Sequence, residues 1–310
     1  MNFEEWGGKR YNNLNAHLKK VFGEKVYRVS LDAGFTCPNR DGTKGFGGCI
    51  FCDAGGSRAG YVDPEIPVLE QLRRGIDFVR KNTGAKKFIA YFQAFSNTYA
   101  SVERLEKLYR SVLSVQGVVG ISISTRPDLL PEETLDLIED LAKETYLWLE
   151  IGIQTMKEET LRILNRGHGL SENYDAIIRS KKRRNIRVLA HVILGLPGES
   201  LDDMIFTARE LSRLNIDGIK MHHLYVIEGT VLHEMYNKGE VKVFQTAGEY
   251  AEIAVKFLEN LTPSIIIHRL QGFAREGLVA PAWTSNKFIA TQKIEQILER
   301  LDTWQGKSMV

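Results

Sequence analysis

Short runs rich in β-branched and aromatic residues alternate with longer amphipathic stretches along most of this chain, and this order limits the possible fold more than any other feature. The short runs have the length of strands, and the long ones repeat their apolar residues at helical spacing. Such alternation predicts a parallel sheet with right-handed crossovers, open or curled towards a barrel. The expected strands cover 25–31, 87–92, 117–124, 146–153, 187–194 and 218–226, and the expected helices cover 67–81, 101–114, 131–143, 157–165, 171–184 and 200–214.

All three cysteines of the chain, Cys37, Cys49 and Cys52, lie in one loop directly after the first expected strand. In folds of this kind, chemistry gathers at the carboxyl ends of the strands. Three cysteines within sixteen residues are more typical of metal ligands than of disulfides. Because a [4Fe-4S] cluster normally takes four thiolates, three would leave one iron open to a small molecule.

Other roles for the cysteines remain open at this point. A disulfide between Cys49 and Cys52 would need an oxidising compartment, and the sequence MNFEEWGGKRYNNLNAH lacks the apolar stretch of a secretory signal. Zinc could bind this pair with Cys37 and a nearby histidine, although structural zinc sites usually use two close-spaced pairs. A thioredoxin-like redox pair would not need the third cysteine.

Length and composition are compatible with one large enzyme domain. The chain has 310 residues, 43% of them hydrophobic, and a formal net charge of +2, which neither demands nor excludes a nucleic acid partner. No apolar run approaches the roughly 20 residues of a membrane span, so we expect a cytoplasmic protein without membrane contact. We expect an N-terminal segment (1–24), a partial barrel (25–230) and a C-terminal extension facing the substrate (231–310).

Three motifs in this order resemble the radical S-adenosylmethionine (SAM) superfamily: the cysteine loop, EIGIQTMKEETLRILNRGH and HVILGLPGES. The last two are similar to the catalytic subunit of Elongator and to oxygen-independent coproporphyrinogen oxidase. The superfamily usually spaces its cysteines C-x3-C-x2-C, whereas eleven residues separate Cys37 from Cys49 here. A long first spacing also occurs in the Elongator branch and in a small bacterial radical SAM family, which this chain resembles most. The resemblance implies an α/β fold, a partial (βα)6 TIM-like barrel with a C-terminal extension.

The resemblance also implies the chemistry. Cys37, Cys49 and Cys52 would hold a [4Fe-4S] cluster whose fourth iron binds SAM, and an external one-electron donor such as flavodoxin or ferredoxin would supply the electron. Reductive cleavage of SAM would give a 5′-deoxyadenosyl radical, which abstracts hydrogen from the substrate. Since no further cysteine exists, an auxiliary cluster is not expected. Tyr225 or Tyr91, near strand ends, is a candidate hydrogen donor or radical relay.

Several polar side chains match positions that bind SAM in relatives. Glu150 ends the run YLWLE, and a carboxylate there would bind the amino or ribose groups of SAM, or form a salt bridge inside the barrel with a residue such as Arg187. Gln154 and Arg166 match SAM contacts, and Arg166 suits the SAM carboxylate unless it only ends a helix.

Other candidate SAM contacts lie after the other strands. The turn that begins at Gly195 would shape the adenine pocket, or serve only as a strand-to-helix turn. Phe51 would lie against the adenine or simply pack in its loop. The candidates after the second and third strands are Gln93, Ser96 and Ser124 for SAM, and Arg126 for an anionic group at the active site, although many such arginines only tie loops together.

The substrate is less well defined by the sequence. The expected substrate contacts are His222, His268, Arg269 and Lys287, because they mix cationic and aromatic groups. The basic run 181–184 is either a solvated surface or a phosphate-binding patch. We expect a tRNA-modifying enzyme that acts on the wobble uridine, as the likeness to Elongator implies. The alternatives are a small-molecule or porphyrin-like substrate and a zinc-binding RNA-interaction module.

Overall fold

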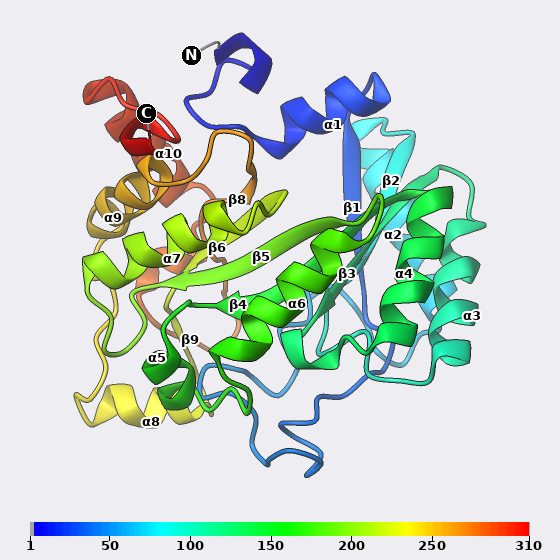
Figure 1. Ribbon diagram of the computed structural model, residues 1–310, viewed down its shortest axis with the longest axis horizontal. Helices are drawn as coiled ribbons and strands as arrows, with labels where there is room; N and C mark the ends of the chain where they lie inside the picture. Colours follow the sequence, from blue (N-terminus) through cyan, green and yellow to red (C-terminus); the bar gives the residue numbers. More distant parts are fainter. Residues whose placement is uncertain (1–2, 310) are drawn as a thin grey trace.

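The computed structural model describes residues 3–309, which form one curled parallel sheet with helices on its outer side (Figure 1). Seven parallel strands lie in the order β1-β2-β3-β4-β5-β6-β8. The sheet therefore confirms the expected α/β partial barrel. The strands of the sheet are β1 (Val26–Leu31), β2 (Lys87–Phe92), β3 (Val118–Thr125), β4 (Tyr146–Gln154), β5 (Arg187–Leu194), β6 (Gly218–His223) and β8 (Ile266–Arg269).

Helices connect the first six strands, each of which pairs in parallel with the next. A separate antiparallel pair, β7 (Val226–Ile227) and β9 (Leu278–Ala280), lies beyond the sheet. The α-helices are α1 (Leu14–Phe22), α2 (Val68–Thr83), α3 (Val102–Leu113), α4 (Glu132–Glu144), α5 (Glu158–Ile163), α6 (Leu170–Lys182), α7 (Leu201–Arg213), α8 (Val231–Asn237), α9 (Ala247–Glu259) and α10 (Ile289–Arg300). Short 3-10 helices cover Phe3–Trp6, Pro127–Leu129, Ala282–Ser285 and Lys307–Met309.

The six expected strands are present, two of them with the predicted bounds, β2 and β5. The run 218–226 is not one strand, because β6 ends at His223 and β7 begins at Val226. The seventh strand, β8, was not predicted. It comes from the region after residue 231 and pairs in parallel with β6, so the C-terminal part of the chain completes the sheet.

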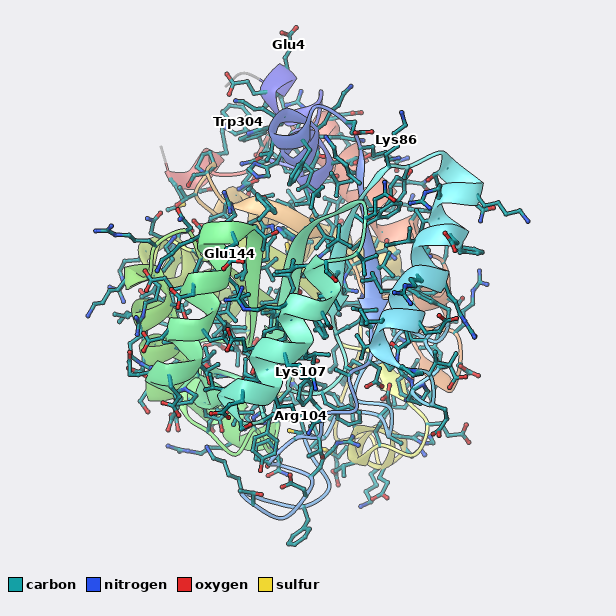
Figure 2. All side chains as sticks on the ribbon, turned by 90° about the vertical axis from the view of Figure 1, so that its right-hand side faces the viewer. Glu4, Lys86, Arg104, Lys107, Glu144 and Trp304 are labelled. Carbon is teal, nitrogen blue, oxygen red and sulfur yellow. The ribbon has the colours of Figure 1, made fainter. Side chains whose placement is uncertain are left out.

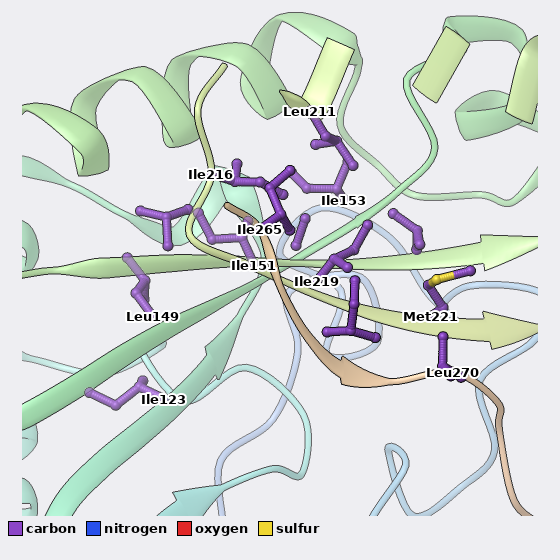
Figure 3. Packing of buried hydrophobic residues seen from close by; sticks show 14 of the residues in the cluster. Ile123, Leu149, Ile151, Ile153, Leu211, Ile216, Ile219, Met221, Ile265 and Leu270 are labelled. Atoms are coloured by element: carbon purple, nitrogen blue, oxygen red, sulfur yellow. The ribbon is translucent and has the colours of Figure 1, made fainter. Parts of the chain in front are cut away.

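The two faces of the sheet differ in chemistry because side chains alternate along each strand. The outer face is apolar: Ile151 and Ile153 of β4 and Ile219 and Met221 of β6 pack in one buried cluster that also contains Leu211 of α7 (Figure 3). The residues that alternate with them along the strands, such as Glu150 and Lys220, point into the barrel. The interior of the barrel is therefore polar above its base, and the main hydrophobic core lies between the sheet and the helices.

An apolar plug closes the barrel at the amino ends of the strands. Ile89, Trp148 and Leu189 point inward there and form a buried cluster with Leu14 and Leu18 of α1. Helix α1 lies at this end, at the top of the view in Figure 1, while the loop after β1 lies at the opposite end. The barrel interior is therefore closed at the amino ends of the strands.

Charged side chains cover the outer helices (Figure 2). Arg110 on α3 contacts Glu106 one turn earlier at 2.8 Å and Glu144 of α4 at 2.9 Å. Exposed pairs of this kind each contribute less than about 1 kcal/mol. In residues 3–309 we find no helix with the length and apolar character needed to cross a membrane.

Candidate active site

A cavity of about 360 Å³ lies at the carboxyl ends of the strands and is bordered by all three cysteines. Cys49 is buried, and Cys37 and Cys52 are partly exposed. All three thiols are free, so the structure contains none of the disulfides considered from the sequence. The cysteine loop therefore lies where the barrel fold places chemistry, as the sequence predicts.

Glycines and a network of backbone contacts shape the cysteine loop. Gly47 and Gly48 have positive φ angles of 77° and 80°, a conformation that glycine adopts without a steric cost. The Ile50 N–H donates to the Leu164 carbonyl at 3.1 Å, and Asn165 Nδ2 donates to the Gly48 carbonyl at 2.8 Å. Asn39 Nδ2 also donates to the Asn165 carbonyl at 2.5 Å, so the parts of the loop near Cys37 and near Cys49 are both attached to the segment after α5.

N–H donors surround the sulfur atoms. Arg166 Nη1 lies 3.2 Å from Cys49 Sγ, Asn39 Nδ2 lies 3.8 Å from the same sulfur, and Arg126 Nη1 lies 3.9 Å from Cys37 Sγ. Such donors stabilise anionic sulfur and tune iron-sulfur clusters. Within residues 3–309, no three His, Cys, Asp or Glu side chains converge closely enough to hold a single metal ion. Three thiolates that each bind a different iron need no such convergence, so this donor set fits a cluster.

Arg126, the predicted anion-binding residue, is engaged with neighbouring protein groups. Its Nε donates to Asp128 Oδ1 at 2.9 Å and its Nη2 donates to the Arg166 carbonyl at 2.6 Å. Burial opposes charge on this guanidinium, but the hydrogen bonds to Asp128 and that carboxylate's charge outweigh it and raise the Arg126 pKa. Arg126 thus ties the Pro127–Leu129 turn to the cysteine loop, and a substrate anion would have to compete with Asp128.

A buried carboxylate, Glu150, forms the centre of the polar layer below the cysteines. Its Oε1 accepts hydrogen bonds from Arg28 Nη1 at 3.1 Å and Ser122 Oγ at 2.6 Å. Its Oε2 contacts His191 Nε2 at 2.7 Å and also Lys220 Nζ. The alternative of a salt bridge inside the barrel is therefore confirmed, but the suggested partner, Arg187, was wrong. Arg187 pairs in register with Trp148, two residues closer to the amino end of β4, and its guanidinium lies over the Tyr146 ring.

Burial and charge shift the pKa values of these groups in different directions. Burial alone would raise the pKa of Glu150, but the Lys220 ammonium, His191 and Arg28 hold it well below its ordinary value. Burial lowers the pKa of Lys220 to about 7 against the opposing attraction of Glu150. Burial and the positive charge of Lys220 lower the pKa of His191 to about 4. Glu150 is therefore ionised and His191 is neutral at neutral pH.

Tyr91 connects this layer to the third strand. Its Oη lies 2.9 Å from Lys220 Nζ and 3.2 Å from Ser124 Oγ, and the ring lies 4.4 Å from the Lys220 ammonium. Burial and the Glu150 charge raise the Tyr91 pKa, so the phenol keeps its proton. Tyr225 also borders the cavity, and burial raises its pKa. Both proposed relay residues therefore face the cavity as neutral phenols.

The structure brings most of the predicted site residues together and leaves a few apart. Glu150 lies behind the cavity wall. Gly195 is not on the wall, since its Cα faces the Phe244 ring. His268 lies deeper, with its ring 4.3 Å from Trp148. The predicted residues on the cavity wall are Cys37, Cys49, Phe51, Cys52, Gln93, Ser96, Ser124, Arg126, Gln154, Arg166, His222, Tyr225 and Arg269.

Sequence analysis did not identify Arg28, His191 or Lys220. Each lies in an expected strand, and each contacts Glu150 inside the barrel. These residues could have been found from the alternation of side chains along each strand. A charged or imidazole side chain inside a buried strand needs a polar environment, and the barrel interior provides one.

A larger cleft of about 1070 Å³ adjoins the cavity at the open side of the barrel, where β1 and β8 form the two edges of the sheet. Arg28, Gln93, His222, Tyr225 and Arg269 border both spaces. Lys287 and His268, two predicted substrate contacts, line this cleft and not the smaller cavity. The cleft is therefore a direct lateral route to the polar layer.

Two of the four residues in the basic run 181–184 form ion pairs. Lys181 Nζ contacts Asp217 at 2.7 Å, and Arg183 contacts Asp136 at 2.5 Å and Glu139 at 3.2 Å. These acidic neighbours offset part of the charge that the sequence alone suggested for phosphate binding.

Comparison with known proteins identifies the family. The model of the radical SAM superfamily matches residues 37–211, and that of the radical SAM C-terminal domain matches residues 216–300. The "Uncharacterized protein YtqA" of Bacillus subtilis is 40% identical over 300 residues, 96% of this chain and 92% of that protein. "Elongator complex protein 3" of Saccharomyces cerevisiae is 30% identical over 169 residues, 54% of this chain but 29% of that protein.

A solved structure supports the same fold. Elp3 of the archaeon Methanocaldococcus infernus, solved without residues 1–46, has a TM-score of 0.64 and 18% identity over 90% of this chain and 64% of that one. At this identity the likeness shows the fold alone. The match of the superfamily model to more than half of the chain, together with the full-length relatives, shows that this protein belongs to the radical SAM superfamily and is a radical SAM enzyme.

Proposed function

We propose that this radical SAM enzyme acts on tRNA and remodels the side chain at carbon 5 of the wobble uridine. The observation that carries the proposal is the lateral cleft, whose charge and aromatic residues suit a nucleic acid and which opens onto the SAM cavity. The partial similarity to Elongator complex protein 3 adds support.

The cofactors of this family are a [4Fe-4S] cluster and SAM, which together supply a carbon-centred radical able to abstract hydrogen. In this chain, Cys37, Cys49 and Cys52 would hold the cluster, and Arg166 lies beside it. Arg166 Nη2 donates to the Gly152 carbonyl at 2.6 Å, and its buried Nε has no partner in the part of the chain that the structure describes. That free N–H can donate a hydrogen bond to an anionic group such as the SAM carboxylate.

Radical SAM enzymes need a one-electron donor. We propose a flavodoxin or ferredoxin in this role, docked on the side of the cysteine loop. The rim of that loop exposes Phe46, whose side chain is 79% accessible. Lys44, two residues before it, is paired with Asp128 at 2.6 Å, so the exposed ring is the feature that supports docking here.

The walls of the lateral cleft carry more positive than negative charge. Three carboxylates, Asp53, Glu276 and Glu295, line it. Some of the cations are already paired, for example Lys9 with Glu295 at 2.7 Å. The excess is still positive, as phosphate binding requires. The seven cations on its walls are Lys9, Lys25, Arg28, Arg58, Arg269, Arg275 and Lys287.

Aromatic side chains accompany these cations. The Phe273 ring has the Arg275 guanidinium at 5.5 Å and the Lys287 ammonium at 5.2 Å from its centre. Tyr61 and Phe288 in the same cleft are 70% and 64% exposed, which is unusual for large aromatic residues. Single-stranded nucleic acids bind to this combination, because bases stack on the rings while phosphates contact the cations.

The inner cavity is far too small for a folded RNA. Its volume of about 360 Å³ would be shared with the cluster and SAM, so at most one nucleobase could approach them from the cleft side. A tRNA would therefore stay in the cleft and insert one unstacked nucleotide into the barrel, at a cost of a few kcal/mol. Anticodon loop nucleotides are exposed and partly unstacked, so the wobble base is among the easiest to insert.

The test measures binding and product together. Arg275→Glu/Lys287→Glu should weaken binding of bulk tRNA and make the logarithmic salt slope shallower by roughly 2, since each lost phosphate contact removes about 0.7–0.9. The control is Lys86→Glu/Lys107→Glu, which changes the charge equally at exposed positions on the outer side (Figure 2). Reconstituted enzyme with SAM and dithionite should change a uridine nucleoside in tRNA, as measured by mass spectrometry of digests. Equal weakening in both variants, or unchanged nucleosides with active SAM cleavage, would contradict the proposal and favour a small-molecule substrate.

A further inference from the structure

The polar layer at the base of the cavity holds more positive than negative charge. Arg28, Lys220 and Arg269 all border the cavity, and the carboxylate among them is Glu150. Asp53, the acidic residue on the cavity wall itself, belongs to the cysteine loop, and its carboxylate accepts a hydrogen bond from the Ser57 backbone N–H at 3.2 Å. The layer therefore carries one anion for three basic side chains.

Glu150 has no capacity left for the third cation. Arg28 and Ser122 donate to Oε1, and His191 and Lys220 contact Oε2. A carboxylate accepts about four hydrogen bonds, so its acceptor sites are filled. The ion pairs of Glu150 are confined to Arg28, Lys220 and His191.

Arg269, at the end of β8, lacks an anionic partner. Within residues 3–309 no carboxylate lies at ion-pair distance from it, and its buried Nε has no hydrogen-bond partner. Its Nη2 contacts His222 Nδ1 at 2.8 Å. Burial, followed by the positive charge of Arg269, lowers the pKa of His222 well below its ordinary value, so the imidazole is neutral and Nδ1 accepts this hydrogen bond.

An arginine in this position is unfavourable without a ligand. A guanidinium stays charged in proteins, and a buried charge without a counter-charge is costly. The same side chain borders both the inner cavity and the lateral cleft, so a group that enters from the cleft can reach it. A bidentate oxyanion would use the free Nε and complete the fork of the guanidinium.

We propose that Arg269, with Arg28 and Lys220 beside it, binds an anionic oxygen group of the substrate at the junction of the cleft and the barrel. The group is a carboxylate or a phosphate. If the substrate is tRNA, as proposed above, the anion is either the phosphate of the inserted nucleotide or a carboxylate on its base. Only the assignment of the anion to tRNA rests on the proposed function. The excess of positive charge around Arg269 does not depend on which molecule carries the anion.

The carboxylate of SAM is the competing explanation. Arg166 is placed for that group, because it contacts Cys49 Sγ at 3.2 Å and keeps a free Nε, whereas Arg269 contacts His222 on the cleft side. If Arg269 instead held SAM, saturation with SAM would fill its site. The two explanations can therefore be separated by measuring anion binding with SAM present.

The experiment uses the cluster-loaded enzyme saturated with SAM at constant ionic strength in chloride. Binding of ¹³C-acetate and of inorganic phosphate is followed by NMR titration. We expect at least one probe to bind, with a dissociation constant raised at least tenfold in Arg269→Gln and less in Arg269→Lys, which keeps the charge. Acetate binding alone would indicate a carboxylate, and phosphate binding alone would indicate the nucleotide backbone.

Two results would overturn the inference: equal binding of both probes by the parent and Arg269→Gln, or no binding of either probe in the SAM-saturated parent. If Arg269→Gln does not fold, Arg269→Lys and Arg269→Met are compared with the parent in the same titration. Binding of tRNA is measured in parallel. If the parent enzyme does not bind tRNA, the proposed function is refuted, while the result of the anion titration still stands. The two failures are therefore distinguishable.

Discussion

Replacing His191 by glutamine should make the protein less sensitive to acid, and the size of the effect follows from its contact with Glu150. His191 Nε2 lies 2.7 Å from Glu150 Oε2, and burial and Lys220 lower its pKa to about 4. In the unfolded chain its pKa is near 6.5. Between these values the unfolded state binds a proton that the folded state does not, so stability falls as the pH decreases.

The expected magnitude is set by that difference in pKa. At pH 5.5 the unfolded histidine is about 90% protonated, and the folded one is nearly neutral. The His191 side chain therefore lowers the free energy of unfolding by about 1.4 kcal/mol more at pH 5.5 than at pH 7.5. Glutamine keeps an N–H donor for Glu150 but does not titrate. His191→Gln should lose about 1.4 kcal/mol less stability than the parent between pH 7.5 and pH 5.5.

The assay is urea unfolding of the anaerobic, cluster-loaded protein at both pH values, with His233→Gln as the control. His233 lies in the first turn of α8, outside the polar layer. The quantity compared is the change in unfolding free energy between the two pH values. Identical losses in the parent and in His191→Gln would refute the reasoning, because they would show that this histidine titrates normally in the folded state.

Two other predictions concern the cluster and the packing of α2. Cys49→Ala should lower the bound iron and sulfide and abolish 5′-deoxyadenosine formation with SAM and dithionite, and a variant with full activity would exclude Cys49 as a ligand. Gly75→Ala should destabilise the protein by about 1–3 kcal/mol in urea unfolding. The new Cβ would lie 2.3 Å from Val29 Cγ1 of β1, and the better helix propensity of alanine, about 1 kcal/mol, would only partly offset this clash. An unchanged midpoint would contradict that packing argument.

The strands could be predicted from the sequence because each one buries an apolar outer face against helices. β8 was missed because it has only four residues, of which His268 and Arg269 are polar. Its place in the sheet depends on pairing with β6, a contact between segments more than forty residues apart. Such pairings leave little trace in local periodicity.

The place of the three cysteines at the cavity could also be predicted, whereas the polar layer could not. Glu150 was identified as a charged residue in an apolar strand, yet its partners come from β1, β5 and β6. Arg187 was a reasonable alternative partner, but the register of β4 and β5 places it beside Trp148. The alternative of a zinc-binding RNA-interaction module is excluded because the chain belongs to an enzyme superfamily.

The apolar plug at the amino end of the barrel limits how far any molecule can reach inside. Ile89, Trp148 and Leu189 of the plug lie two residues before Tyr91, Glu150 and His191 of the polar layer, a rise of roughly 7 Å along each strand. The barrel is therefore a shallow well rather than a channel. The plug therefore lets only a short group of the substrate reach the level of the polar layer, while the rest of the substrate stays outside.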